Sequence, residues 1–276
     1  MRAALYQMHI VWNDEDRNYA KVRHQLARAA SDGVDVFLMP ETCYDGFFAG
    51  NSLEDCRIVQ ENLRLAEHYG LASGFGWVRR DALPVPPSER RKYENHYTIV
   101  GKDGNILSDY TKLHLFQGAR KGQAFRPGDH MALCQICGIP TGTFICYDLW
   151  FPELISKLSE QAHLVLLPAN WEETEYQYSH WKTLLQARAM ENQQYILAVN
   201  CVGRNGRFHY GGCSAAVNPL GEFLPVAAGD REILMTDREG LLIYDIEDDV
   251  EKYRHSFPVA ANRLPALYPD LPVRPL

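Results

Sequence analysis

The chain has 276 residues, a formal net charge of −7 and seven cysteines. The length suits one large α/β domain, the acidic balance argues against a nucleic-acid partner, and the absence of an apolar run of roughly 18 residues argues against a membrane partner. The odd number of cysteines, behind a start that does not resemble a signal peptide, predicts a cytoplasmic protein with reduced thiols.

Signals for strands and helices alternate from the first residues onward. Residues 2–9 have a strand pattern, 14–31 have helical spacing, and the apolar run 34–40 is typical of a strand buried on both faces. A second helix is expected over 53–69, where Gly70 would end it, and a strand over 71–78.

The second half of the chain continues this alternation. The expected elements are an exposed loop over 81–92, a hairpin over 97–115 around Asp103-Gly104, a loop over 117–130, two strands around Pro140 of which the second covers 142–146, a buried strand over 163–168, a helix over 178–194 and a strand over 195–202. The pattern favours a single layered α/β domain over residues 1–276. By itself it leaves a three-layer sandwich, a barrel and a four-layer sandwich open.

Polar residues stand where α/β folds place functional groups. Glu41 directly follows the apolar run that ends at Pro40, and the carboxyl end of a buried strand is a common position for a functional carboxylate. An exposed loop acid is the alternative. In a strand, Tyr110, Lys112 and His114 would point to one face, and a solvent-facing hairpin is the alternative there.

Cys146 lies between an expected strand end and a helix that begins near Pro152, since proline is favoured in a first helical turn. A cysteine on such a sharp turn presents its sulfur outward, and neighbouring backbone N–H groups can bind an oxyanion. A buried structural cysteine is the alternative.

Taken in order, these segments resemble the signature of the nitrilase superfamily of carbon–nitrogen hydrolases. The matching motifs are Pro-Glu at 40–41, Tyr-x-Lys-x-His-Leu-Phe at 110–116, Cys-Tyr-Asp-Leu-x-Phe-Pro-Glu at 146–153, His-Trp at 180–181, Leu-Leu-Gln-Ala-Arg-Ala-Met-Glu-Asn-Gln at 184–193, Asn-Pro-Leu-Gly at 218–221 and Asn-Arg-Leu-Pro-Ala-Leu-Tyr at 262–268. The resemblance spans essentially the whole chain. It implies a four-layer αββα sandwich and a homodimer or larger homo-oligomer, with the helices near Cys146 and the helix over 178–194 at the interface.

The resemblance also implies a catalytic triad in which Glu41 is the general base, Lys112 the electrostatic stabiliser and Cys146 the nucleophile. A free thiol has a pKa of about 8.5, so it needs a proton acceptor or a nearby cation at neutral pH. The backbone N–H of Tyr147 would bind the oxyanion together with Lys112. His114 is then expected to be structural rather than a base.

Asn170 and Trp171 follow the strand over 163–168 and are expected to line the substrate pocket. Ordinary packing in the pocket wall is the alternative for Trp171. The implied reaction resembles that of the ω-amidase-like and aliphatic amidase branches, in which a small linear carboxamide gives a carboxylic acid and ammonia without a metal or cofactor. An N-carbamoyl amide hydrolase or a nitrilase would use the same triad, and a non-catalytic scaffold that keeps the fold is the alternative from another class.

Two positions depart from the family pattern. The loop over 117–126 lacks the second glutamate that family members often carry there, and its Arg120 and Lys121 lead to the hypothesis that the substrate bears a distal carboxylate. Trp150 stands where arginine is common, and its ring would either narrow the pocket or pack at a dimer surface.

Two further pairs have structural interpretations. Cys134 and Cys137 have the C-x-x-C spacing of some metal sites, but no second ligand pair accompanies them and a strand would point the two thiols to opposite faces. Arg188 and Glu191 are three residues apart in an expected helix, which predicts an ion pair that braces the site.

Overall fold

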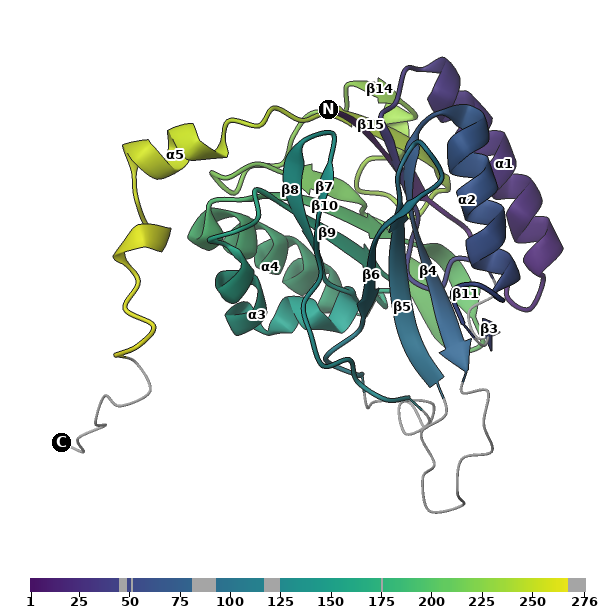
Figure 1. Ribbon diagram of the computed structural model, residues 1–276, viewed down its shortest axis with the longest axis horizontal. Coiled ribbons are helices and arrows are strands. Elements are labelled where there is room, and N and C mark those ends of the chain that lie inside the picture. The colour runs from purple at the N-terminus through teal and green to yellow at the C-terminus, as the bar shows by residue number, and fades with distance from the viewer. Residues whose placement is uncertain (45–48, 51, 81–92, 117–124, 175, 268–276) are drawn as a thin grey trace, which may run out of the picture.

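Two β-sheets pack face to face, with helices on both outer sides (Figure 1). The computed structural model describes all residues except 45–48, 51, 81–92, 117–124, 175 and 268–276. The expected loop over 81–92, most of the loop over 117–130 and the end of the final motif therefore lie outside the described residues. None of the helices in the described part of the chain is long and apolar enough to cross a membrane.

The larger sheet has the strand order β14-β15-β1-β2-β4-β5-β6, with β3 beside β4. Its strands are β1 (Arg2–Gln7), β2 (Val36–Leu38), β3 (Ala49–Gly50), β4 (Ala72–Arg80), β5 (Tyr93–Val100), β6 (Ile106–Thr111), β14 (Ala228–Gly229) and β15 (Gly240–Asp245). Strands β1, β2 and β4 run parallel, while β4, β5 and β6 form an antiparallel meander.

The smaller sheet has the order β13-β10-β9-β8-β7. Its strands are β7 (Leu133–Ile136), β8 (Ile139–Thr143), β9 (Leu164–Ala169), β10 (Tyr195–Asn200) and β13 (Ala215–Val217), and a separate two-stranded ribbon consists of β11 (Val202–Asn205) and β12 (Phe208–Gly211).

The helices form the outer layers. Figure 1 shows α1 (Glu15–Ser31) and α2 (Arg57–Tyr69) side by side against the larger sheet, while α3 (Pro152–Leu158) and α4 (Gln177–Asn192) lie on the opposite side of the molecule, next to the smaller sheet. The remaining helical segments are α5 (Val250–Ser256) and the short 3-10 helices η2 (Cys146–Trp150), η3 (Arg231–Ile233) and η4 (Ala260–Asn262).

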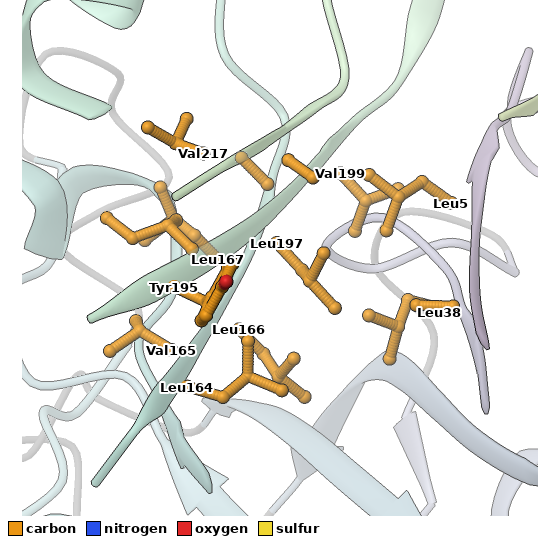
Figure 2. Close-up of a cluster of buried hydrophobic side chains, with 14 of the residues drawn as sticks. Leu5, Leu38, Leu164, Val165, Leu166, Leu167, Tyr195, Leu197, Val199 and Val217 are labelled. Atoms are coloured by element: carbon orange, nitrogen blue, oxygen red, sulfur yellow. The ribbon is translucent and has the colours of Figure 1, made fainter. Parts of the chain in front are cut away.

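The core between the sheets follows from strand periodicity. Leu5 of β1 and Leu38 of β2 point toward Leu197 and Val199 of β10 (Figure 2), and all four are fully or almost fully buried. Each such side chain contributes roughly 1.5–3 kcal/mol when it leaves water. The alternate residue Tyr6 faces the other way and packs in the cluster that α1 and α2 supply.

These layers make an αββα sandwich, so the predicted fold class is confirmed. The choice among the architectures that the pattern left open depends on β1 and β2, which bury both of their faces. One face meets the helices and the other meets the second sheet, an arrangement that the hydrophobicity of the strands alone does not specify.

Several predicted boundaries differ from the structure, and for two of them the structure shows the physical cause. The strand expected over 142–146 ends at Thr143, because the N–H of Ile145 is bound by the side chain of Asp148 and Cys146 starts a 3-10 helix. The helix expected over 53–69 begins only at Arg57, because residues 52–55 form a turn closed by the Ser52 hydroxyl. Its end was predicted correctly, as Gly70 adopts the left-handed conformation with φ 64°.

Candidate active site

A cavity of about 590 Å³ opens where several strands of both sheets end. Glu41 follows β2, Lys112 follows β6, Cys146 follows β8, and Asn170 and Trp171 follow β9. All five line this cavity, together with Tyr147. The structure thus brings together the six residues that the sequence nominated for catalysis and substrate binding in the described part of the chain, from positions up to 130 residues apart.

Glu41 and Lys112 form a buried ion pair at the cavity floor. Lys112 Nζ lies 2.7 Å from Glu41 Oε1, and the two residues are only 4% and 6% exposed. Asn95 Nδ2 donates to the same oxygen at 2.6 Å, and the backbone N–H of Asn170 donates to Oε2 at 2.9 Å. The carboxylate therefore has a partner on each oxygen, as a buried charge requires.

The protonation states follow from burial and from this pairing. Burial by itself raises the pKa of Glu41, but the Lys112 charge and the three hydrogen bonds outweigh it and hold the pKa below its ordinary value. Burial lowers the pKa of Lys112, and the Glu41 charge more than reverses the effect. Burial, followed by the Glu41 charge, raises the pKa of the Cys146 thiol. The resting site thus holds a neutral thiol beside an ionised carboxylate, which is the arrangement of a nucleophile with its base.

Cys146 lies on a sharp turn, as the sequence predicted. Its φ is 49°, in the left-handed region that non-glycine residues rarely adopt, and its side chain lines the cavity together with Glu41. Asp148 secures the turn, because its carboxylate accepts the N–H of Ile145 at 3.0 Å and the N–H of His114 at 2.8 Å.

His114 and Tyr110 have structural contacts. The ring of His114 lies 3.1 Å from Asp148 through Nδ1 and stacks on Phe151 with ring centroids 3.6 Å apart. The Tyr110 hydroxyl donates to Asp148 at 2.8 Å. The expectation of a structural His114 agrees with this geometry, although β6 ends at Thr111, so a continuous strand does not carry residues 110 to 114.

A glycine on the neighbouring strand lets the Glu41 segment approach. A Cβ on Gly76 of β4 would overlap the backbone of Glu41 and Thr42. Thr42 itself has φ 45°. The close contact and this conformation turn the chain at the end of β2, so that the Glu41 carboxylate enters the cavity while Cys43 N–H still bonds to the Gly76 carbonyl.

The cavity wall is mostly aromatic. Its aromatic residues are Trp12, Phe116, Phe125, Tyr147, Trp150, Phe151, Trp171, Phe208 and Tyr210. Trp150 stacks on Trp171 with ring centroids 6.0 Å apart and an angle of 16° between the planes. Of the two roles considered for Trp150, the structure supports the one in which the ring shapes the pocket.

The predicted ion pair of Arg188 and Glu191 is confirmed, with Nη1 3.0 Å from Oε1. The Arg188 guanidinium also donates to the carbonyls of Leu149 and Trp150 in η2. Helix α4 therefore braces the turn that carries Cys146.

Three residues of the site were not found from the sequence. Asn95 donates a hydrogen bond to Glu41. The side chain of Asn200 accepts the N–H of Trp171 at 2.8 Å and donates to the carbonyl of Trp171 at 3.2 Å. Glu172 places a second carboxylate in the cavity wall. The pairing of the two hairpin strands could have pointed to Asn95, because its backbone carbonyl accepts the N–H of Lys112 and the two residues are therefore neighbours. No local motif marks the other two.

Some residues considered in the sequence lie elsewhere or outside the described part. Cys134 belongs to β7, whereas Cys137 occupies a turn with φ 51°, so the expected strand does not contain both thiols. Within the described residues, no group of three or more His, Cys, Asp or Glu side chains is arranged to hold a metal ion. Arg120 and Lys121 lie outside the described residues.

Known proteins resemble this chain over nearly its full length. The family model described as carbon-nitrogen hydrolase matches residues 2–255. A protein named omega-amidase YafV from Yersinia enterocolitica is 31% identical, covering 94% of each chain. The 2-oxoglutaramate amidase of Bacillus subtilis is 30% identical over 88% of this chain and 93% of its own.

One solved structure bears on the cysteine. It is a variant of an amidase from Nesterenkonia sp. AN1 that shows the Michael addition of acrylamide at the active-site cysteine. That chain superposes with a TM-score of 0.78 at 25% identity, covering 98% of this chain and 99% of its own.

Proposed function

The chain belongs to the carbon–nitrogen hydrolase family, and from this premise we propose that it hydrolyses a small linear carboxamide to the carboxylic acid and ammonia through a thioester on Cys146. The observation that carries the proposal is the thiol of Cys146 beside the buried pair of Glu41 and Lys112 at the floor of one cavity. The named amidases among its relatives support the same reaction class.

Acylation would begin when Glu41 takes the thiol proton and Cys146 Sγ attacks the amide carbon. The carbonyl oxygen becomes an oxyanion, which Lys112 and the backbone N–H of Tyr147 stabilise. Glu41 then returns the proton to the amide nitrogen, the C–N bond breaks, and ammonia leaves a thioester behind.

Deacylation would use the same base. Glu41 removes a proton from water, the resulting hydroxide attacks the thioester carbon, and the thiolate of Cys146 departs. The proton returns to the sulfur, so the free acid and the resting thiol are restored. The hydrogen bonds from Asn95 and Asn170 hold Glu41 in place for both half-reactions.

Ammonia release from a panel of substrates tests this function. The panel contains linear amides, nitriles and N-carbamoyl amines, and we expect turnover of the amides. Intact-mass measurement should detect an acyl adduct on the wild type and none on Cys146→Ala. Cys134→Ala is the matched control, because this thiol does not line the cavity, and it should keep both turnover and adduct.

Other outcomes separate the alternatives. Preferred turnover of N-carbamoyl amines or nitriles would reassign the substrate while keeping the triad. Absence of both turnover and adduct across the panel would instead support a non-catalytic scaffold.

We also propose that the chain forms a homodimer or larger homo-oligomer, as the resemblance implies. Supporting this, Met190 is 55% exposed, although it is a large apolar side chain on α4, the helix expected at the interface. Light scattering of the wild type against Met190→Glu tests it. A wild-type monomer at micromolar concentration would contradict the proposal. The cytoplasmic location expected from the cysteines stays a prediction.

A further inference from the structure

The wall of the cavity carries a carboxylate that the proposed mechanism does not use. Glu172 lines the cavity, is partly exposed, and its side chain has no hydrogen bond or ion pair with any described residue. Lys112 is the only cationic side chain among the described residues of the lining, and Glu41 already neutralises it. The described wall therefore presents one uncompensated negative charge.

Several aromatic residues line the cavity on the same side as this carboxylate. Glu172 and Tyr210 are directly opposite each other in an antiparallel bridge, so their side chains lie on the same face. Phe208 is two residues before Tyr210 on β12 and shares that face. Trp12 packs against Tyr210 with ring centroids 5.8 Å apart. All four residues line the cavity.

The backbone holds Glu172 firmly in this position. The preceding residue, Trp171, is bound on both its N–H and its carbonyl by Asn200. The following residue, Glu173, donates its N–H to the carbonyl of His209 at 2.7 Å. Glu172 is thus a fixed part of the wall and is connected through Asn170 to the Glu41 end of the cavity.

Aromatic faces and a carboxylate together bind a cation better than either does alone, since the ring quadrupoles and the negative charge both attract an ammonium group. A substrate carboxylate would instead meet Glu172 in a largely apolar cavity, where like charges repel strongly. Resting on the proposed amidase function, we propose that Glu172 makes this site selective for amides whose acyl chain carries an amine at its far end.

This proposal opposes the hypothesis that Arg120 and Lys121 select a distal carboxylate. One described cation lies against this aromatic group: the Arg207 guanidinium is 5.0 Å from the ring centroid of Phe208, but Arg207 is exposed and outside the lining. Water and salt screen such a charge, whereas Glu172 faces the cavity itself. The two hypotheses differ in the sign of the preferred substrate charge.

Three amides that differ only at the far end test the charge directly. 5-Aminopentanamide, hexanamide and adipic acid monoamide all carry four methylene groups next to the amide carbon and end in an ammonium, a methyl and a carboxylate group, respectively. We expect kcat/KM to fall in that order for the wild type, by roughly tenfold or more between the first and the last. In Glu172→Gln, the ratio of kcat/KM for 5-aminopentanamide to kcat/KM for hexanamide should fall about tenfold. Glu173→Gln is the matched control, because this neighbouring acid pairs with His209 and does not line the cavity.

The results separate the inference from the function on which it rests. Turnover that favours the anionic amide, or a charge preference that is identical in Glu172→Gln, overturns the inference while the amidase function stands. An equal loss of all three activities in Glu172→Gln would assign this carboxylate to catalysis and also overturn it. If the wild type hydrolyses none of the three, the amidase proposal fails for linear amides. Calorimetry then measures the binding of the three amides to Cys146→Ala, and their dissociation constants give the charge preference without turnover.

Discussion

The hydroxyl of Tyr110 donates a hydrogen bond of 2.8 Å to the Asp148 carboxylate and thereby joins the two sheets beside the candidate cavity. Tyr110 lies at the end of β6, two residues before Lys112, and Asp148 lies two residues after Cys146. Asp148 is fully buried. One carboxylate therefore sets the position of the proposed nucleophile relative to the proposed cation.

Removing this hydroxyl should lower both the stability of the protein and its catalytic rate. A hydrogen bond to a charged acceptor contributes about 1.5–3 kcal/mol, so Tyr110→Phe should lower the free energy of unfolding by that amount in urea titrations. Displacement of Cys146 from Lys112 should lower kcat by on the order of tenfold to a hundredfold. Tyr195→Phe is the control, because it removes a similar bond to Asp249, the residue directly before α5, and neither Tyr195 nor Asp249 lines the cavity. Equal kcat losses in both variants would show that Tyr110 has no specific positioning role.

Breaking the pair of Glu41 and Lys112 should cost more than removing it entirely. Lys112→Met leaves Glu41 buried without its counter-charge, which should lower the free energy of unfolding by about 3–5 kcal/mol. The double variant Glu41→Gln with Lys112→Met removes both charges and should regain part of that loss. All three variants, including Glu41→Gln alone, should be inactive. A double-mutant cycle measures the coupling, and strictly additive losses of stability would contradict a direct interaction.

The pH dependence of the reaction should follow Glu41. Since its pKa lies below the ordinary value, kcat/KM should stay high into mildly acidic solution and fall only as pH drops through that lowered pKa. Asn95→Asp would place a second carboxylate against Glu41 Oε1, and the repulsion should move the acidic limb to higher pH. Asn105→Asp adds the same charge at an exposed turn and should leave the limb in place. An unmoved limb in Asn95→Asp would mean that Glu41 does not control it.

Stability at alkaline pH should depend on His96. Burial lowers the pKa of this nearly inaccessible imidazole, but its contacts with Asp109 at 2.8 Å and Glu94 raise it above the ordinary value. A raised folded-state pKa contributes stability below the unfolded value of about 6.5, and the contribution disappears as pH rises through the folded value. The drop in Tm between pH 6 and 9 should therefore be smaller in His96→Gln than in the wild type. His130→Gln, at an exposed imidazole, should keep the wild-type slope.

Much of the architecture was predictable because strand and helix periods are local properties. The buried strand before Glu41, the turn at Cys146, the helix start at Pro152 and the helix end at Gly70 all leave local signals. The end of β8 could not be predicted this way, since the apolar residues through Ile145 continue the strand pattern. Only the bond from Ile145 to Asp148 shows that the ladder has stopped.

The sequence by itself determined the family signature and the types of residue that the chemistry needs. Tertiary structure decided which groups meet: Asn95 on Glu41, Asn200 on Trp171, and Glu172 among the aromatic residues. These contacts join residues separated by tens of positions, so they depend on the register of strands and the packing of two sheets rather than on any local period. For the same reason, the net charge of −7 said little about the substrate, whereas the placement of one carboxylate in the cavity wall predicts the charge of the substrate it selects.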